Sequence, residues 1–323
     1  MTTPVVVATR RWTQRACDEL ARQFDVRLNQ EDHPLSLDEV RSRCEGATVL
    51  CPWGGDRLDA EFIASLPDTI KLIACISAGT EHVDIAAATA RGIVGATPPD
   101  VVTEETADMT FALLLGLCRR LVHGDTLIRT GGWQGLSIDD PNSGSRVWGK
   151  TLGIIGLGGI GTAVARRAAA FRMTVVYHNR TPKPEAEMAC DARYCATLDE
   201  LLQIADIVSL HCPLTEQTRN LIDANALSKM KSGAVLINTA RGAVVDEAAL
   251  SDALIQGKIA GAGLDVFLTE PGGGEHLTSL DNVLLSPHVG TATTETRDEM
   301  GLRVIENIKA FLSTGQPRDK VER

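Results

Sequence analysis

The chain has 323 residues, which is long for one hydrophobic core and favours two domains, since a domain holds about 100–200 residues. Its formal net charge of -10 argues against nucleic acid as a partner, because a duplex binder needs clustered Lys and Arg to displace counterions. Aromatic residues make up only 4% of the chain. The core must therefore be built from Ala, Val, Leu and Ile, a composition that suits buried parallel strands.

The cysteines and the apolar runs bear on the compartment. The eight cysteines are scattered, and no two are spaced as a CxxC pair, so the sequence predicts no metal site. Reduced cysteines in a chain of this size indicate the cytoplasm. The apolar run before Arg10 fits a first strand rather than a signal peptide. The longest strongly apolar helical stretch, 109–118, is about half the length needed to cross a bilayer, so we expect no membrane association.

The N-terminal part of the chain alternates two kinds of segment. Short apolar runs that indicate strands lie at 5–8, 47–50 and 72–77, and helix-like stretches lie around 13–24, 36–44 and 59–65. Strands that alternate with helices predict a parallel sheet.

A single long helix is predicted over 104–129, because acidic residues occupy its first turn and a glycine pair follows its end. Its apolar face is too large for one domain, so we expect it to pack against a symmetry mate in a homodimer. The stretch 134–146 is rich in turn residues and predicts a loop or linker.

After Lys150 the pattern is that of a complete dinucleotide-binding sheet. Six strand-like runs follow, the first within 150–155 and the others at 174–179, 206–212, 234–240, 261–267 and 282–288. They are separated by helical patterns, as in a doubly wound sheet. A final helix is predicted over 295–312, outside that sheet, and we expect it to return to the first domain.

The segment GLGGIG fits the G-x-G-x-x-G motif and lies between a strand and a helix. Gly156 makes the tight turn, Gly158 lets the backbone approach a pyrophosphate, and Gly161 lets the helix pack on the strand. The helix that begins near Gly159 and Ile160 offers free N–H groups and a positive dipole end to the phosphates. The segment therefore predicts a dinucleotide site.

The end of the next strand bears on which dinucleotide is bound. An NAD site usually has Asp or Glu there, to bind the ribose 2′-hydroxyl. This chain has Asn179, followed by Arg180 and Thr181. No carboxylate repels a 2′-phosphate, and a guanidinium is available to pair with it, so NADP(H) is favoured. The alternative is a solvated loop arginine in an enzyme that uses NAD(H).

Three further residues follow strands on the same side of the sheet. Arg241 follows the run 234–240, Glu270 follows 261–267, and His288 follows the last predicted strand. Ligand crevices of open α/β sheets lie outside the carboxyl ends of the strands. Arginine grips carboxylates, histidine transfers protons near neutral pH, and a glutamate beside it favours its charged form. These residues are therefore candidate catalytic groups.

Four motifs together resemble the D-isomer-specific 2-hydroxyacid dehydrogenase family. They are GLGGIG, NTARGAVVDEAAL (238–250), GAGLDVFLTEP (261–271) and SPHVGTAT (286–293), and the resemblance runs from about residue 45 to 312. The segments HNRT and SAGTEHVD look most like the glyoxylate/hydroxypyruvate reductase branch.

The resemblance implies a role for each matching residue. Arg241 would bind the carboxylate and carbonyl oxygen of the substrate, His288 would be the acid/base, and Glu270 would be its partner. Asp265 would hold the nicotinamide carboxamide. Further cofactor contacts are implied at Thr106, Gly159, Ile160, Cys212, Pro213, Thr218, Thr239, Ala240, Arg241, His288 and Gly290, and substrate contacts at Trp53, Ser77, Ala78, Gly79, Arg241 and His288.

Two tryptophans have alternative interpretations. Trp53 and Trp133 either line the substrate site, the latter from a neighbouring subunit, or pack in the core. The glycine-rich stretch 271–280 lacks the proline that is common after His276 in the family, so its conformation is open.

The sequence and the resemblance together predict an α/β protein with two doubly wound parallel-sheet domains. A Rossmann cofactor domain of residues 101–289, which carries the long dimerisation helix, is inserted into a flavodoxin-like substrate domain of residues 1–100 and 290–323. The expected activity is the NAD(P)H-dependent reduction of glyoxylate or hydroxypyruvate to the D-2-hydroxy acid. Two alternatives stay open: a dehydrogenase for a larger 2-keto acid, such as 2-ketogluconate or an aryl or alkyl pyruvate, and a non-catalytic, corepressor-like protein that senses the dinucleotide.

Overall fold

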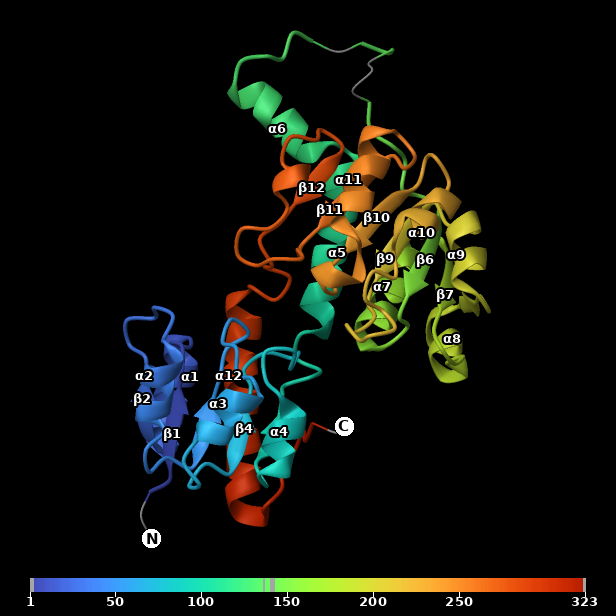
Figure 1. Ribbon diagram of the computed structural model, residues 1–323. Helices are drawn as coiled ribbons and strands as arrows, with labels where there is room; N and C mark the ends of the chain where they lie inside the picture. Colours follow the sequence, from blue (N-terminus) through green and yellow to red (C-terminus); the bar gives the residue numbers. More distant parts are fainter. Residues whose placement is uncertain (1–2, 136, 140–142, 322–323) are drawn as a thin grey trace. The chain divides into compact units, whose positions relative to one another are not determined.

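The computed structural model describes residues 3–135, 137–139 and 143–321. The chain divides into two compact units (Figure 1). Unit 1 comprises Met1–Val102 and Thr291–Arg323, and unit 2 comprises Thr103–Gly290. The final red helix lies among the blue N-terminal elements, so unit 1 joins two segments that are far apart in the sequence.

Unit 1 is built on a five-stranded parallel sheet with the strand order β2-β1-β3-β4-β5. This order is the flavodoxin-like one. The strands are β1 (Val5–Ala8), β2 (Asp25–Leu28), β3 (Val49–Cys51), β4 (Leu72–Ala74) and β5 (Val94–Ala96). β1 lies between β2 and β3, with Val6 paired to Val26 on one side and to Val49 on the other.

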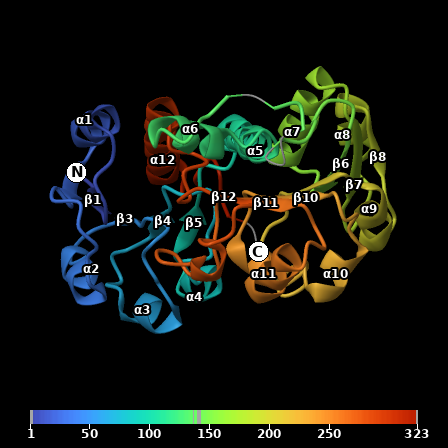
Figure 2. The ribbon, with the colours of Figure 1, turned by 90° about the horizontal axis from the view of Figure 1, so that it is seen from above.

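Helices cover both faces of this sheet. They are α1 (Gln14–Gln23), α2 (Leu37–Arg43), α3 (Ala60–Ser65), α4 (Ile85–Ala90) and α12 (Thr294–Thr314). Figure 2 shows α1 and α12 on one face and α2, α3 and α4 on the other, and each face has its own hydrophobic cluster. Polar caps begin these helices: Thr13, Ser36 and Asp59 each accept a hydrogen bond from a first-turn N–H.

Unit 2 is built on a seven-stranded parallel sheet with the order β12-β11-β10-β9-β6-β7-β8. The strands are β6 (Thr151–Ile155), β7 (Thr174–His178), β8 (Ala192–Tyr194), β9 (Ile207–Leu210), β10 (Val235–Asn238), β11 (Gly261–Leu264) and β12 (Val283–Leu285). The order reverses beside β6, which is the Rossmann switch point. The predicted α/β fold with two parallel sheets is confirmed. Three strands, β2, β5 and β8, were not predicted, because a strand of three or four residues with at most two buried side chains carries almost no pattern.

The helices of unit 2 are α5 (Thr103–Cys118), α6 (Leu121–Arg129), α7 (Gly159–Ala170), α8 (Pro184–Cys190), α9 (Leu198–Ile204), α10 (Ala224–Lys229) and α11 (Glu247–Ile255), with 3-10 turns η1 (Gly242–Val244) and η2 (Glu275–Leu277). α5 and α7 lie on one face of the sheet, and α10 and α11 lie on the other (Figure 2). Gly153 of β6 lies so close to Leu201 of α9 that an added Cβ would lie 2.6 Å from Leu201 Cδ2.

The prediction of one helix over 104–129 is wrong. Arg120 adopts a left-handed backbone conformation, with φ 49° and ψ 40°, and separates α5 from α6. No glycine or proline marks this break, so nothing in the local sequence pointed to it. The two helices also differ in burial, since α5 buries many residues and α6 buries none. Over the described ranges, no helix is both long and apolar enough to cross a membrane.

Candidate active site

The glycine turn after β6 has the geometry that its sequence requires. Gly156 has φ 101°, and a Cβ there would lie 2.6 Å from the backbone nitrogen of Cys212. A Cβ on Gly161 would lie 2.3 Å from the carbonyl oxygen of Gly156. At Gly158, in contrast, a Cβ would meet nothing within 4 Å. Two of the glycines therefore let backbone pack on backbone, and the third leaves open space at the N-terminus of α7, which no side chain caps.

The loop after β7 joins this turn through Asn179. Its Oδ1 accepts a hydrogen bond of 2.8 Å from the backbone N–H of Leu157. Arg180 and Thr181 are exposed, and among the described residues neither side chain has a hydrogen-bond or ion-pair partner. Asn179, which stands where an NAD site usually has an acid, is thus hydrogen-bonded within the protein. The neighbouring guanidinium of Arg180 is exposed and accessible to a ligand.

Three threonines connect α5 to the loop after β10. The hydroxyl of Thr110 donates to the carbonyl oxygen of Thr106 at 2.8 Å and lies 3.0 Å from the hydroxyl of Thr239. Thr110 was not singled out from the sequence, although it lies one helical turn after Thr106. Its hydroxyl joins the backbone of Thr106 to the side chain of Thr239, the two threonines for which the family resemblance implies cofactor contacts.

The turn after β9 carries Cys212, Pro213 and Thr218. Thr218 Oγ1 donates to the carbonyl oxygen of Pro213 at 2.7 Å and fixes the turn. Burial raises the pKa of the Cys212 thiol to about 11, so this sulfur is a protonated, unreactive group near pH 7. Burial also lowers the pKa of the adjacent His211 to about 3, and its Nε2 lies 2.8 Å from Ser209 Oγ. This imidazole is therefore neutral and structural.

Glu270 and His288 are joined directly. Nδ1 of His288 lies 2.5 Å from one carboxylate oxygen of Glu270, and the other oxygen accepts the backbone N–H of Phe267 at 2.8 Å. Burial raises the pKa of Glu270, but the hydrogen bonds from His288 and Phe267 outweigh it and hold the pKa below its ordinary value. The ionised carboxylate orients the ring, and the His288 side chain is 50% exposed.

Hydrogen bonds to Asp265 fix the turn that carries His288. His288 has a positive φ of 54°, and the next two backbone N–H groups, of Val289 and Gly290, donate to the two carboxylate oxygens of Asp265 at 3.0 and 2.8 Å. Asp265 is buried. The family resemblance implies a cofactor role for this carboxylate; in the structure it accepts hydrogen bonds from the backbone that follows His288.

Arg241 lies on a loop that packs against the Glu270 loop. The side chain of Asn238 donates to the carbonyl oxygen of Arg241 at 3.0 Å and accepts the N–H of Ala240 at 3.0 Å. A Cβ on Gly242 would lie only 1.9 Å from the carbonyl carbon of Phe267. Neither Asn238 nor Gly242 was predicted as a site residue, although both flank Arg241 in NTARG. They bring the loops after β10 and β11 into contact.

The candidate residues of unit 1 follow β3 and β4. The backbone N–H of Trp53 donates to Asp56 at 2.8 Å, and the guanidinium of Arg297 lies 4.7 Å from the centre of the Trp53 ring. The hydroxyl of Ser77 donates to the carbonyl oxygen of Gly79 at 2.9 Å. A Cβ on Gly54 would lie 3.9 Å from that of Ser77, so the two loops are neighbours. Unit 1 thus brings Trp53 and the loop at 77–79 together.

Trp133 and the stretch 271–280, for which the sequence left alternatives, both lie in unit 2. Trp133 is 57% exposed, so the core-packing interpretation is wrong for it within this chain. The stretch 271–280 is folded tightly on Phe267: a Cβ on Gly273 would lie 2.2 Å from the carbonyl oxygen of Thr269, and one on Gly274 would lie 2.9 Å from the Phe267 ring. These glycines therefore shape the loop that carries Glu270.

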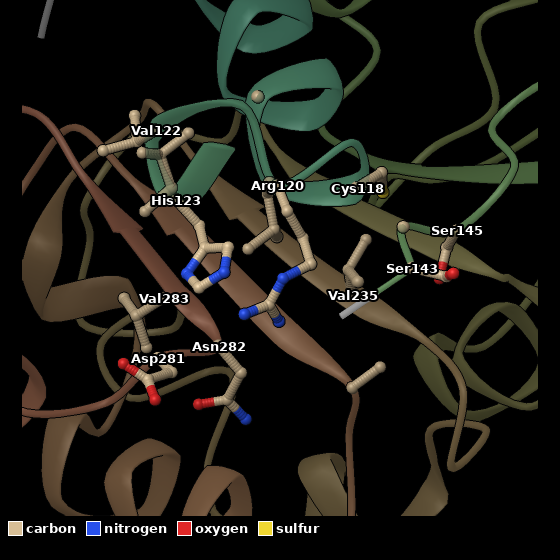
Figure 3. Close-up of a pocket in the computed structure, with 15 residues that line it drawn as sticks. Cys118, Arg120, Val122, His123, Ser143, Ser145, Val235, Asp281, Asn282 and Val283 are labelled. Atoms are coloured by element: carbon tan, nitrogen blue, oxygen red, sulfur yellow. The ribbon is translucent and has the colours of Figure 1, made fainter. Parts of the chain in front are cut away.

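A cavity of about 130 Å³ lies at the other end of the strands of the unit 2 sheet. Figure 3 shows the side chains of Arg120 and His123 extending toward Asp281 and Asn282, beside the first residue of β10, Val235. It lies at the amino ends of β10 and β12, whereas the glycine turn and the three candidate catalytic residues follow the carboxyl ends of their strands. The cavity is therefore separate from the candidate active site.

A Rossmann sheet with this glycine turn and a His–Glu pair beside an arginine loop defines a dinucleotide-dependent oxidoreductase. The family model for the NAD binding domain of D-isomer specific 2-hydroxyacid dehydrogenases matches residues 111–290. Two curated relatives are similar over nearly their whole length. The glyoxylate reductase of Thermococcus onnurineus is 40% identical over 99% of this chain and 96% of its own, and that of Aeropyrum pernix is 39% identical over 100% and 97%.

Solved structures agree with these relatives. An NADPH-dependent glyoxylate/hydroxypyruvate reductase from Sinorhizobium meliloti, in complex with NADP and malonate, superposes with a TM-score of 0.89 at 34% identity, over 99% of this chain and 97% of that one. A glyoxylate reductase from Paecilomyes thermophila gives 0.88 at 35% identity, over 99% of both chains. The chain belongs to the D-isomer-specific 2-hydroxyacid dehydrogenase family. The family assignment from the sequence motifs is confirmed, and with it an oxidoreductase that binds a nicotinamide dinucleotide.

Proposed function

We propose that this protein reduces a short 2-keto acid, glyoxylate or hydroxypyruvate, to the D-2-hydroxy acid with a reduced nicotinamide dinucleotide. The observation that carries the proposal is the His288–Glu270 pair at 2.5 Å, on a loop in contact with the Arg241 loop. An arginine and an oriented histidine are the groups that reduction of a 2-keto acid needs. The relatives named glyoxylate reductase, which match almost the full length of this chain, support this choice of substrate.

The residues at the glycine turn fit a bound dinucleotide. The open space at Gly158 and the uncapped N-terminus of α7 suit a pyrophosphate. We propose that unit 2 binds the cofactor through Thr106, Gly156, Gly158, Gly159, Ile160, Gly161, Asn179, Arg180, Thr181, Cys212, Pro213, Thr218, Thr239, Ala240, Arg241, Asp265, His288 and Gly290. When bound, the reduced nicotinamide supplies the hydride.

The chain's own residues supply binding and the proton. Arg241 grips the carboxylate of the substrate and stabilises the negative charge that develops on the carbonyl oxygen. The protonated ring of His288 donates its Nε2 proton to that oxygen, while Glu270 accepts a hydrogen bond from Nδ1 and orients the ring. In unit 1, we propose that Trp53, Ser77, Ala78 and Gly79 contact the substrate, with backbone N–H groups of the loop directed at its carboxylate.

NADP(H) is the favoured cofactor in this proposal, and NAD(H) stays possible. Asn179 puts no negative charge beside the ribose, and its side-chain oxygen already accepts the N–H of Leu157. The exposed guanidinium of Arg180 is open to pair with a 2′-phosphate.

We also propose a homodimer formed through α6 and the segment after it. Leu121, Val122 and Ile128 are 67%, 56% and 65% exposed, and Trp133 is 57% exposed. So many large apolar side chains on one short helix and its continuation favour cover by a second copy of the chain. The eight free cysteines suit the reducing cytoplasm.

The test is a panel of 2-keto acids with both cofactors, followed by the absorbance of the reduced nicotinamide. We expect turnover of glyoxylate and hydroxypyruvate that exceeds turnover of 2-ketogluconate and aryl pyruvates. Faster reduction of the larger acids would reject the substrate proposal. Tight cofactor binding with no turnover of any acid would instead indicate a dinucleotide sensor.

A further inference from the structure

The loop of residues 179–183 is held at both ends by tyrosine hydroxyls. At one end, Tyr177 accepts a hydrogen bond of 2.8 Å from the backbone N–H of Lys183 and donates to the carboxylate of Glu187. At the other end, the hydroxyl of Tyr194 donates to the carbonyl oxygen of Asn179 at 3.2 Å. The chain has only two tyrosines, and both hold this loop.

The two phenol groups are themselves firmly placed. Tyr177 and Tyr194 lie on the neighbouring strands β7 and β8, and their ring centres are 5.4 Å apart. Tyr177 is fully buried. Burial, together with the hydrogen bond to Glu187, raises the pKa of Tyr177 to about 12, so its hydroxyl keeps its proton throughout the neutral range.

Between the two attachment points the side chains face solvent. Arg180 and Thr181 are exposed, and neither side chain has a hydrogen-bond or ion-pair partner in the described part of the chain. Asn179 adds a third attachment, through its hydrogen bond to Leu157 in the glycine turn. The backbone of the loop is thus fixed before any ligand arrives, while its ligand-facing side chains stay open.

We infer that Tyr177 and Tyr194 are positioning residues for cofactor selection, which hold the loop so that Arg180 meets the 2′-phosphate of NADP(H). The tyrosines touch no ligand and act through the backbone of the loop. A loop that is ordered before binding loses less conformational entropy when the ligand binds. The affinity therefore increases for the ligand whose 2′-phosphate contacts the loop. The inference rests on the proposed NADP(H) preference.

The experiment measures dissociation constants by calorimetry for NADPH, NADH, adenosine 2′,5′-bisphosphate and AMP. Tyr177→Phe and Tyr194→Phe keep the rings and remove the hydroxyls. We expect each variant to raise the dissociation constants of NADPH and adenosine 2′,5′-bisphosphate, which carry a 2′-phosphate, about three- to tenfold. Those of NADH and AMP should rise less than about twofold. The kcat value at saturating NADPH should stay at the wild-type level.

A double-mutant cycle separates positioning from a general structural effect. In an Arg180→Ser background, Tyr177→Phe should change the NADPH/NADH ratio no further, because the group that it positions is gone. Ser251→Ala is the matched control, since it removes another buried hydroxyl, 3.4 Å from the carbonyl oxygen of His276, and should leave the ratio unchanged.

Two outcomes would overturn the inference: equal weakening of all four ligands, or a lower Tm with an unchanged ratio. Failure of the proposed function would look different. It would appear in the wild type, as absence of turnover or as tighter binding of NADH, whereas the effect of the tyrosines is read from the change in the ratio.

Discussion

The loops that carry the candidate catalytic residues and the loop at 179–183 follow strands of the same sheet, but they are fixed in different ways. The catalytic loops are fixed by close packing: Gly242 touches Phe267, and Gly290 lies against the buried Asp265. The loop at 179–183 is fixed only at its ends, by hydrogen bonds between side chains and the backbone. A change in the packed loops should therefore disturb catalysis and folding together, whereas a change in the open loop should alter ligand preference alone.

The largest effect is expected at His288. His288→Ala should lower kcat about 10²–10⁴-fold, because the proton donor is lost. The side chain is 50% exposed but hydrogen-bonds Glu270, so Tm should fall modestly, and the cofactor dissociation constant should rise far less than kcat falls. Steady-state kinetics and cofactor titration measure both quantities. His276→Ala, which removes an exposed imidazole from η2, is the control and should keep full activity. A His288→Ala enzyme as active as the wild type would contradict the mechanism.

Gly242→Ala tests the packed loops directly. The new methyl group would lie 1.9 Å from the carbonyl carbon of Phe267, so the Arg241 and Glu270 loops must separate. We expect a loss of at least about 2 kcal/mol in the free energy of unfolding, together with a fall in kcat. Gly233→Ala is a matched control, because a Cβ there meets nothing within 4 Å. Equal unfolding curves for the two variants would refute the packing argument.

These contacts explain how far the sequence could predict the molecule. Most strands could be predicted, because buried parallel strands are continuous apolar runs, whereas the short strands β2, β5 and β8 could not. The glycine turn could be predicted, because its spacing is mechanical. The close approach of Gly242 to Phe267 could not, since it joins residues far apart in the chain. The left-handed Arg120 also lacks a local signal, because glycine or asparagine is the usual residue in that conformation.

Glu270 makes the stability of the folded chain depend on pH. Burial raises its pKa, but the hydrogen bonds from His288 and Phe267 hold it below the ordinary value of 4.5. The ionised carboxylate therefore stabilises the folded chain above the unfolded-state pKa, and this contribution is lost as the pH falls through the lower folded-state pKa. Glu270→Gln should be less stable than the wild type near pH 7, and the difference should shrink below about pH 4.

Urea unfolding across this range measures the difference, with the exposed Glu275→Gln as control. Glu270→Gln should also lower kcat at least about tenfold, because a neutral amide is a weaker acceptor for the His288 ring N–H and orients the proton donor less firmly. A stability difference that grows as the pH falls would mean that the carboxylate is not the stabilising form.

Arg180→Ser gives the smallest and most selective effect. The side chain is exposed and no described residue pairs with it, so its removal should leave Tm and kcat unchanged. The kcat/KM for NADPH should fall about five- to tenfold, because a charge-assisted contact with the 2′-phosphate is lost, and the value for NADH should hold. Arg166→Ser removes an equal charge from an exposed position on α7 and controls for the change in net charge. Equal losses of kcat/KM with both cofactors would show that Arg180 does not bind the 2′-phosphate. Any preference for NADPH over NADH would then have to come from another residue.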